Sequence, residues 1–174
     1  MLFVGKLIPL HGLETILAAS RLCPEIEFRI VGNGQLDHVM TERPPNVRWE
    51  AWVDYELLPN VYRSAGCALG IFGTSEKAAR VIPNKAYQAL ATCTPLITAD
   101  TPGARELLNH ERDALLVPSG DPAALATAVR RLAGDSALRG DLASRGRTTY
   151  ETHASERALG RRWRTLLEDL ISGP

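Results

Sequence analysis

The chain has 174 residues, 45% hydrophobic and 23% charged, and its 20 basic side chains balance its 20 acidic ones. This length fits one domain, and the apolar fraction is too high for a disordered chain. The lack of a basic excess argues against a dedicated nucleic-acid-binding protein or a polybasic membrane module. The composition therefore predicts a soluble globular domain with a sizeable hydrophobic core.

Three cysteines, Cys23, Cys67 and Cys93, are too few and too widely spaced for a disulfide scaffold or a structural zinc site. Cys67 and Cys93 border apolar runs, which predicts that both are small buried side chains. No apolar run reaches the roughly 20 residues that span a bilayer, and the first residues do not form a signal peptide. We therefore expect a cytoplasmic chain without a metal site.

Apolar runs and helical spacing alternate along the first two thirds of the chain. In chain order, they predict strand 2–4, helix 12–22, strand 27–31, helix 35–41, strand 47–50, helix 55–64, strand 67–72, loop 73–80, helix 84–91, strand 95–98, helix 103–108 and strand 114–117. Such alternation is typical of a parallel sheet covered on both faces.

From residue 121 onward the pattern is helical only. Asp121 followed by Pro122 is a strong helix start, an N-cap residue before a first-turn proline. That helix ends near residue 134, and two more are expected over 136–150 and 154–171. We predict a single α/β domain over residues 1–174, a doubly wound parallel sheet with a helical C-terminal tail over residues 121–174.

Loops at the carboxyl ends of parallel strands are where such sheets bind ligands. After strand 2–4, the loop carries Gly5, Lys6, His11 and Gly12 just before a predicted helix. Cationic side chains beside helix N–H groups can form an anion site, although an ordinary solvated loop has the same composition. The next candidate, residues 32–34, is a bare Gly-x-Gly, and no Walker sequence is present, which argues against dinucleotide-dependent dehydrogenases and P-loop NTPases.

The loop before helix 84–91 is more informative. Asn84 is a candidate N-cap, which places Lys85 in the first helical turn. A cation there opposes the helix dipole unless an anion accompanies it; the alternative is a lysine that extends to solvent. The chain contains three lysines, and Lys6 and Lys85 lie in the two predicted phosphate loops, with Lys77 in the polar stretch before the second.

Eight runs in this sequence resemble, in order and spacing, the C-terminal domain of retaining GT-B glycosyltransferases, the large "glycosyl transferases group 1" family. They are FVGK with HGL (3–6 and 11–13), IVGNG (30–34), NVRW (46–49), LPNVYRSA (58–65), IPNKAYQALA (82–91), TPLI (94–97), GARELL (103–108) and LVPSGD (116–121).

The resemblance implies a Rossmann-like domain that binds a nucleotide-diphospho-sugar donor, UDP-, GDP- or ADP-linked, as a substrate and without a metal cofactor. In that family an N-terminal domain binds the acceptor, and transfer occurs between the domains with retention of configuration. Because this chain opens directly on a core strand, we expect it to be one half excised from a two-domain, hexosyltransferase-like enzyme, able to bind nucleotide but unable to transfer sugar alone.

Residue by residue, the resemblance assigns the two cations of the family's Gly-Arg-x4-Lys-Gly loop to Lys6 and His11. It places Asn84 and Lys85 beside the phosphates, with Lys6 and Lys85 as the phosphate-stabilising candidates and no catalytic residue assigned. The implied donor-binding set is Gly5, Lys6, His11, Gly32, Asn33, Trp52, Val53, Asn84, Lys85 and Gln88. Trp52 and Val53 would lie near the nucleobase.

The sequence departs from the family where two glutamates are expected, at Arg80 and Gln88. Gln88 can hydrogen-bond the ribose hydroxyls without charge assistance, whereas Arg80 cannot replace a carboxylate. The alternative is therefore a degenerate, non-catalytic domain with a structural or regulatory role. A flavodoxin-like receiver is disfavoured because Asp54 and Asp100 do not form a tight acidic cluster.

Four arginines of the last predicted helix are interpreted as a solvated face. The alternatives are contact with the N-terminal domain or peripheral membrane contact of the full-length protein. The four residues are Arg157, Arg161, Arg162 and Arg164.

Overall fold

A computed structural model describes residues 1–172, and its centre is a six-stranded sheet in which all neighbouring strands pair in parallel. The strand order is β3-β2-β1-β4-β5-β6. The strands are β1 (Leu2–Val4), β2 (Phe28–Val31), β3 (Val47–Glu50), β4 (Ala68–Leu69), β5 (Leu96–Ala99) and β6 (Leu115–Val117). This is the order of a doubly wound, Rossmann-like sheet, and it confirms the predicted fold class.

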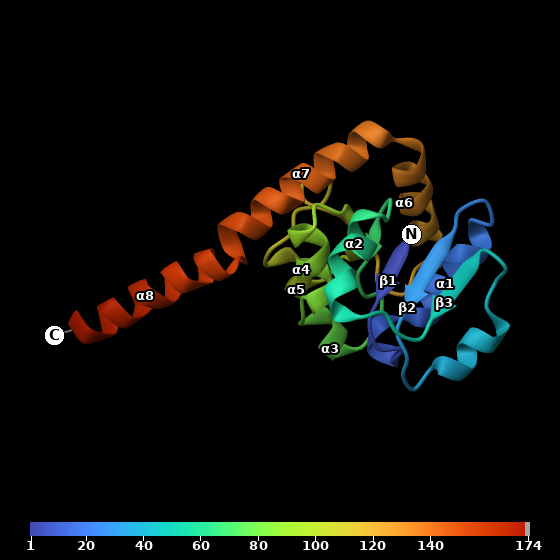
Figure 1. Cartoon of the computed structure of the whole chain (residues 1–174), viewed down its shortest axis with the longest axis horizontal. Helices are drawn as coiled ribbons and strands as arrows, with labels where there is room; N and C mark the ends of the chain where they lie inside the picture. The colour runs from blue at the N-terminus through green and yellow to red at the C-terminus, as the bar shows by residue number, and fades with distance from the viewer. Residues whose placement is uncertain (173–174) are drawn as a thin grey trace.

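Helices cover both faces of the sheet (Figure 1). On one face, α1 (Leu13–Leu22) packs against α6 (Pro122–Gly134). On the other, α4 (Asn84–Ala91) packs against α2 (Leu58–Arg63) and α7 (Ser136–His153). Successive strand residues point to opposite faces, so Phe3 belongs to the first core and Leu2 to the second.

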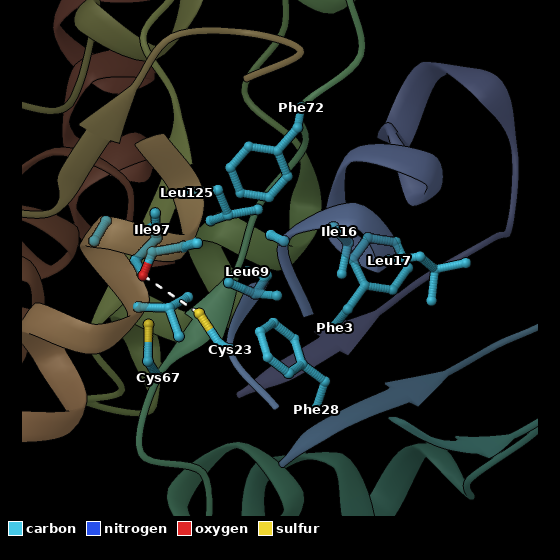
Figure 2. Close-up of a cluster of buried hydrophobic side chains, with 14 of the residues drawn as sticks. Phe3, Ile16, Leu17, Cys23, Phe28, Cys67, Leu69, Phe72, Ile97 and Leu125 are labelled. Carbon is cyan, nitrogen blue, oxygen red and sulfur yellow. Dashed lines mark hydrogen bonds between the residues drawn. The ribbon is translucent and has the colours of Figure 1, made fainter. Parts of the chain in front are cut away.

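The core beneath α1 and α6 is built from aromatic and branched side chains. Figure 2 shows Phe3, Phe28 and Ile97 of the strands meeting Ile16 of α1 and Leu125 of α6. Because both the strand runs and the helical faces are apolar, this core could be assigned from periodicity alone.

The three cysteines have different environments. Cys23 and Cys67 are buried, and the Cys23 thiol donates a hydrogen bond to the Ala126 carbonyl oxygen at 3.5 Å (Figure 2). The prediction that Cys93 is buried is wrong. It is exposed, and it lies just after α4 with φ 57°, in the left-handed region.

Several predicted elements are shorter or tighter than the sequence indicated. Helix 35–41 is a 3-10 helix over Asp37–Glu42, and helix 55–64 divides into a 3-10 turn, Tyr55–Leu57, followed by α2. Strand 67–72 is reduced to the two residues of β4. Beyond them the Gly70 N–H still donates to the Ile97 carbonyl at 2.8 Å, and the Phe72 N–H donates to the His11 carbonyl of the first loop at 3.1 Å.

The predicted loop 73–80 contains a short helix, α3 (Glu76–Ala79), which is a correction to the sequence prediction. The Ser75 hydroxyl accepts a hydrogen bond from the Ala78 N–H at 3.3 Å and so caps this turn. A 3-10 helix over Pro9–His11 precedes α1, and α5 (Pro102–Arg105) begins after Thr101, whose hydroxyl accepts from the Ala104 N–H at 3.1 Å.

The predicted helix start at Asp121 is confirmed. Its carboxylate accepts hydrogen bonds from the N–H groups of Ala123 and Ala124, both at 2.9 Å. The helix that follows, α6, is part of the body of the domain, whereas α8 (Glu156–Ser172) contacts α7 and then extends away from the body (Figure 1). None of the described helices combines the length and the hydropathy that a membrane crossing requires.

Candidate functional site

Two adjoining clefts open at the carboxyl edge of the sheet, where β1 and β4 lie side by side and the strand order reverses. The first cleft has a volume of about 430 Å³ and the second about 260 Å³. Gly5 lines both. The first cleft also contains His11, Asn84, Lys85 and Gln88, and the second contains Lys6, Gly32, Asn33, Trp52 and Val53. Each of the ten residues of the predicted set therefore lines one or both of two adjoining clefts.

Two glycines permit the close packing of this edge. Gly5 has φ 149°, and a Cβ on it would lie 2.9 Å from the Lys85 Nζ. Gly32 has φ 135°, and a Cβ there would lie 2.0 Å from the Gly5 carbonyl oxygen. Both positive φ angles disfavour a side chain, and at Gly32 the contact with backbone excludes one, so this glycine lets the two loops touch.

Lys85 is the most unusual group in the site. Its side chain is 5% exposed, and its Nζ has no hydrogen-bond partner among the described residues. The Nζ lies 3.9 Å from the centre of the Phe3 ring, a cation–π contact. Burial lowers the pKa of Lys85 to about 7. The alternative of a solvent-extended lysine is thus wrong.

The backbone around Lys85 differs from the sequence prediction in one respect. Pro83 occupies the N-cap of α4 and Asn84 is its first residue, so Asn84 is not the capping residue, and no side chain caps this helix. Lys85 nevertheless lies in the first turn as predicted. A buried cation therefore stands at a helix end where the backbone dipole favours an anion.

His11 faces the same cleft. Its Nδ1 lies 2.6 Å from the Lys6 carbonyl oxygen, to which it donates as the Nδ1–H tautomer, leaving Nε2 as an acceptor. Burial, and then the nearby Lys85 charge, lower the pKa of His11 to about 4. His11 is consequently neutral at neutral pH in the absence of an anion.

No Asp or Glu lines either cleft in the described chain. Arg80 lies outside both clefts and pairs with Glu76 at 3.2 Å on the surface. Gln88 does line the first cleft, where its Oε1 accepts a hydrogen bond from the Tyr62 hydroxyl at 3.0 Å. Burial raises the pKa of Tyr62, so this hydroxyl stays a donor. Within residues 1–172, no cluster of three or more His, Cys, Asp or Glu side chains could hold a metal ion.

Sequence reasoning missed Tyr55 and Leu58, which line both clefts and form the boundary between them. Tyr55 is 76% exposed and Trp52, in the second cleft, is 73% exposed. Exposed aromatic rings beside a cleft offer flat apolar surfaces. The sequence offered one signal for this, an aromatic residue, Tyr55, at the start of a predicted helix. Hydrophobic periodicity assigns such a residue to the packed face of the helix rather than to a cleft.

The family model described as "Glycosyl transferases group 1" matches residues 1–135. The chain belongs to this family. Among curated relatives, the lipopolysaccharide core biosynthesis glycosyltransferase LpsD of Rhizobium meliloti (strain 1021) is 30% identical over 164 residues, which cover 90% of this chain and 45% of LpsD. The chain therefore spans less than half the length of this relative.

Solved structures show the same fold for this glycosyltransferase-family chain. Sucrose-phosphate synthase from Thermosynechococcus elongatus superposes with a TM-score of 0.84 at 24% identity, over 98% of this chain and 45% of that one. Anabaena Alr3699/HepE, solved in complex with UDP-glucose, gives a TM-score of 0.80 at 17% identity, over 96% and 48% of the two chains. At these identities the likeness establishes the GT-B type of fold for the domain.

Proposed function

We propose that the two clefts bind the nucleotide-diphospho-sugar donor, UDP-, GDP- or ADP-linked, of a retaining glycosyl transfer. The observation that carries this proposal is the buried Lys85 ammonium, which has no hydrogen-bond partner in the described chain and belongs to a residue that lines the first cleft. A buried polar group without a partner costs free energy, and a diphosphate would supply the missing acceptor oxygens. HepE, of similar fold, has been solved with UDP and with UDP-glucose, which supports this assignment.

The roles follow from the position of each group. Lys85 and the first-turn N–H groups of α4 would stabilise the diphosphate charge that grows as the glycosidic bond breaks. His11 would add a second positive charge once the bound anion raises its pKa. The second cleft, with Lys6 and the exposed Trp52, would hold the nucleoside, and Gln88 the ribose hydroxyls.

We assign no acceptor-binding site to the 174 residues of this chain. Because the chain spans 45% of LpsD, we propose that it is the donor-binding half of a two-domain, cytoplasmic, hexosyltransferase-like enzyme. An N-terminal domain would bind the acceptor, and the full-length protein would make peripheral contact with a membrane. We expect the chain alone to bind donor and to transfer no sugar; sugar transfer by the purified chain would contradict this.

Calorimetry with UDP, GDP and ADP, their sugar derivatives and the corresponding nucleosides tests the donor site. Lys85→Met keeps the buried aliphatic stem but removes the charge, and we expect it to weaken diphosphate binding by about 10- to 100-fold, the value of one charge-assisted hydrogen bond. Nucleoside binding should change little. Lys77→Met, at an exposed lysine, is the matched control and should leave both unchanged. Equal losses for nucleoside and diphosphate would refute the phosphate role.

A second candidate is a non-catalytic domain that keeps the fold and serves a structural or regulatory partner. It is favoured by one observation, the absence of any carboxylate from the lining of both clefts in residues 1–172. No binding of any of the three diphosphates at millimolar concentration would select it. Binding in the micromolar range would select the donor site.

A further inference from the structure

Gln88 stands between two hollows of the domain. It lines the first cleft, and it also lines a pocket of about 270 Å³ at α2 and α4, two helices that lie side by side (Figure 1). Tyr62 lines this pocket and not the first cleft, so it approaches Gln88 from the side away from the first cleft. The pocket, which we call the tyrosine pocket, is lined by all four tyrosines of the chain, Tyr55, Tyr62, Tyr87 and Tyr150.

A hydrogen bond between Tyr62 and Gln88 fixes the orientation of the Gln88 amide. The Tyr62 hydroxyl donates to the Gln88 Oε1 at 3.0 Å, and this is the hydroxyl's one hydrogen bond within residues 1–172. The Tyr62 side chain is 1% exposed. Turning the amide over would leave the buried hydroxyl proton without an acceptor, which costs free energy. The amide oxygen is therefore directed toward Tyr62.

The amide nitrogen of Gln88 is left free to bind a ligand. Gln88 is half-buried, and the Lys85 Nζ is the one buried side-chain nitrogen or oxygen without a partner in the described residues, so the Gln88 Nε2 is accessible. The two polar atoms of a planar amide point apart. Because Oε1 takes the Tyr62 side, Nε2 is directed toward the first cleft. Lys85 precedes Gln88 by three residues on α4, so the two side chains share one face of the helix.

We infer that Tyr62 is a positioning residue of the donor site: it holds the Gln88 amide with its NH2 group toward the first cleft, so that the ligand atom beside Gln88 must be a hydrogen-bond acceptor. This inference rests on the proposed donor-binding function and deepens it. A ribose hydroxyl can donate or accept, and here it accepts from Gln88. A carboxylate at the same position accepts only, and would require the ribose hydroxyl to donate.

A double-mutant cycle tests the positioning role. Tyr62→Phe removes the hydroxyl and keeps the ring, and calorimetry on the full chain should show UDP binding weakened by about three- to tenfold, the cost of ordering one freed side chain on binding. Inorganic pyrophosphate, which has no ribose, should bind within about twofold of its wild-type affinity. In a Gln88→Leu background, adding Tyr62→Phe should change UDP affinity by less than about twofold. Tyr150→Phe, at another tyrosine of the same pocket, is the matched control and should leave UDP binding unchanged.

Gln88→Glu tests the direction of the hydrogen bond. UDP methylated on the 2′ or the 3′ oxygen keeps that oxygen as an acceptor but lacks its proton. Since glutamine and glutamate have nearly the same shape, the steric cost of the methyl group cancels when the two proteins are compared. For one of the two derivatives, the loss of affinity relative to UDP should be at least about tenfold greater in Gln88→Glu than in the wild type.

Three results would contradict this assignment in different ways. A Tyr62→Phe loss that persists in the Gln88→Leu background, or that is equal for pyrophosphate, would overturn the positioning role. Methylation losses that are equal in the two proteins, or larger in the wild type, would overturn the direction of the amide. If the wild-type chain bound neither UDP nor pyrophosphate, the proposed donor site itself would be refuted, and this inference with it.

Discussion

Two charged side chains are buried in the described part of this domain, and they differ in almost every other respect. Asp113, 1% exposed, accepts a hydrogen bond from the Thr149 hydroxyl at 2.8 Å and two from Asn109, from its backbone N–H at 2.9 Å and its amide Nδ2 at 3.0 Å. Lys85, 5% exposed, has the Phe3 ring beneath its ammonium and no hydrogen bond within residues 1–172.

The contrast separates a structural charge from a binding charge. Asp113 ties α7 to the turn before β6 through its own hydrogen bonds, so its desolvation is compensated inside the fold. The desolvation of Lys85 is compensated by one aromatic ring alone, at the edge where parallel sheets bind ligands. Burial by itself therefore says little about function; the absence of internal partners is the informative observation.

The largest effect on stability is expected from removing the carboxylate of Asp113, whose hydrogen bonds are all made within the fold. Asp113→Ala leaves the Thr149 hydroxyl and the Asn109 N–H without their acceptor, which should lower the free energy of unfolding by roughly 4 kcal/mol. Urea denaturation measures this. The matched control, Asp141→Ala, removes an exposed carboxylate 3.5 Å from Arg145, and should cost less than about 0.5 kcal/mol. Equal losses at the two positions would mean that the Asp113 network is not structural.

Removing the charge of Lys85, which has no hydrogen-bond partner in the described chain, should instead increase the stability of the fold. In the ligand-free chain we expect Lys85→Met to raise the free energy of unfolding at pH 7 by on the order of 3 kcal/mol, a stabilisation that denaturation at several pH values would measure. A loss of stability at pH 7 would contradict the view that this ammonium is held at a cost.

The pH dependence of that stabilisation follows from the lowered pKa of Lys85, about 7. Between pH 7 and the ordinary lysine pKa near 10.4, the unfolded chain binds a proton that the folded chain lacks. Wild-type stability therefore rises with pH across this window, and the cost of the buried charge is fully present below pH 7. The advantage of Lys85→Met should shrink toward zero by about pH 10.

The smallest expected effect concerns ligand binding. Because an anion binds the protonated ammonium, the affinity for UDP or inorganic pyrophosphate should fall by up to about tenfold per pH unit above pH 7. Calorimetry in buffers of different ionisation enthalpy should then detect proton uptake on binding at pH 8. Lys85→Arg, which stays charged, should bind without this proton uptake. Uptake that persists in Lys85→Arg would assign the proton to another group.

Much of the fold was predictable because its signals are local. The helix at 84–91 begins and ends as the sequence indicated, and the Asp121 cap forms as expected. The predictions that are wrong concern segments whose structure depends on contacts with parts of the chain that are distant in sequence. The strand expected over 67–72 is two residues long, and its far end hydrogen-bonds the first loop through the Phe72 N–H and the His11 carbonyl. The α3 turn is too short to have a helical period.

By itself, the sequence determined the alternation of strands and helices and brought the two cation-bearing loops to one edge of the sheet. This is possible because apolar residues recur every two residues in a strand and every 3.6 in a helix. The state of Lys85 was decided by the tertiary structure alone. Desolvation depends on every group around a charge, and Phe3 and Gly5, which surround this ammonium, lie about eighty residues earlier in the chain.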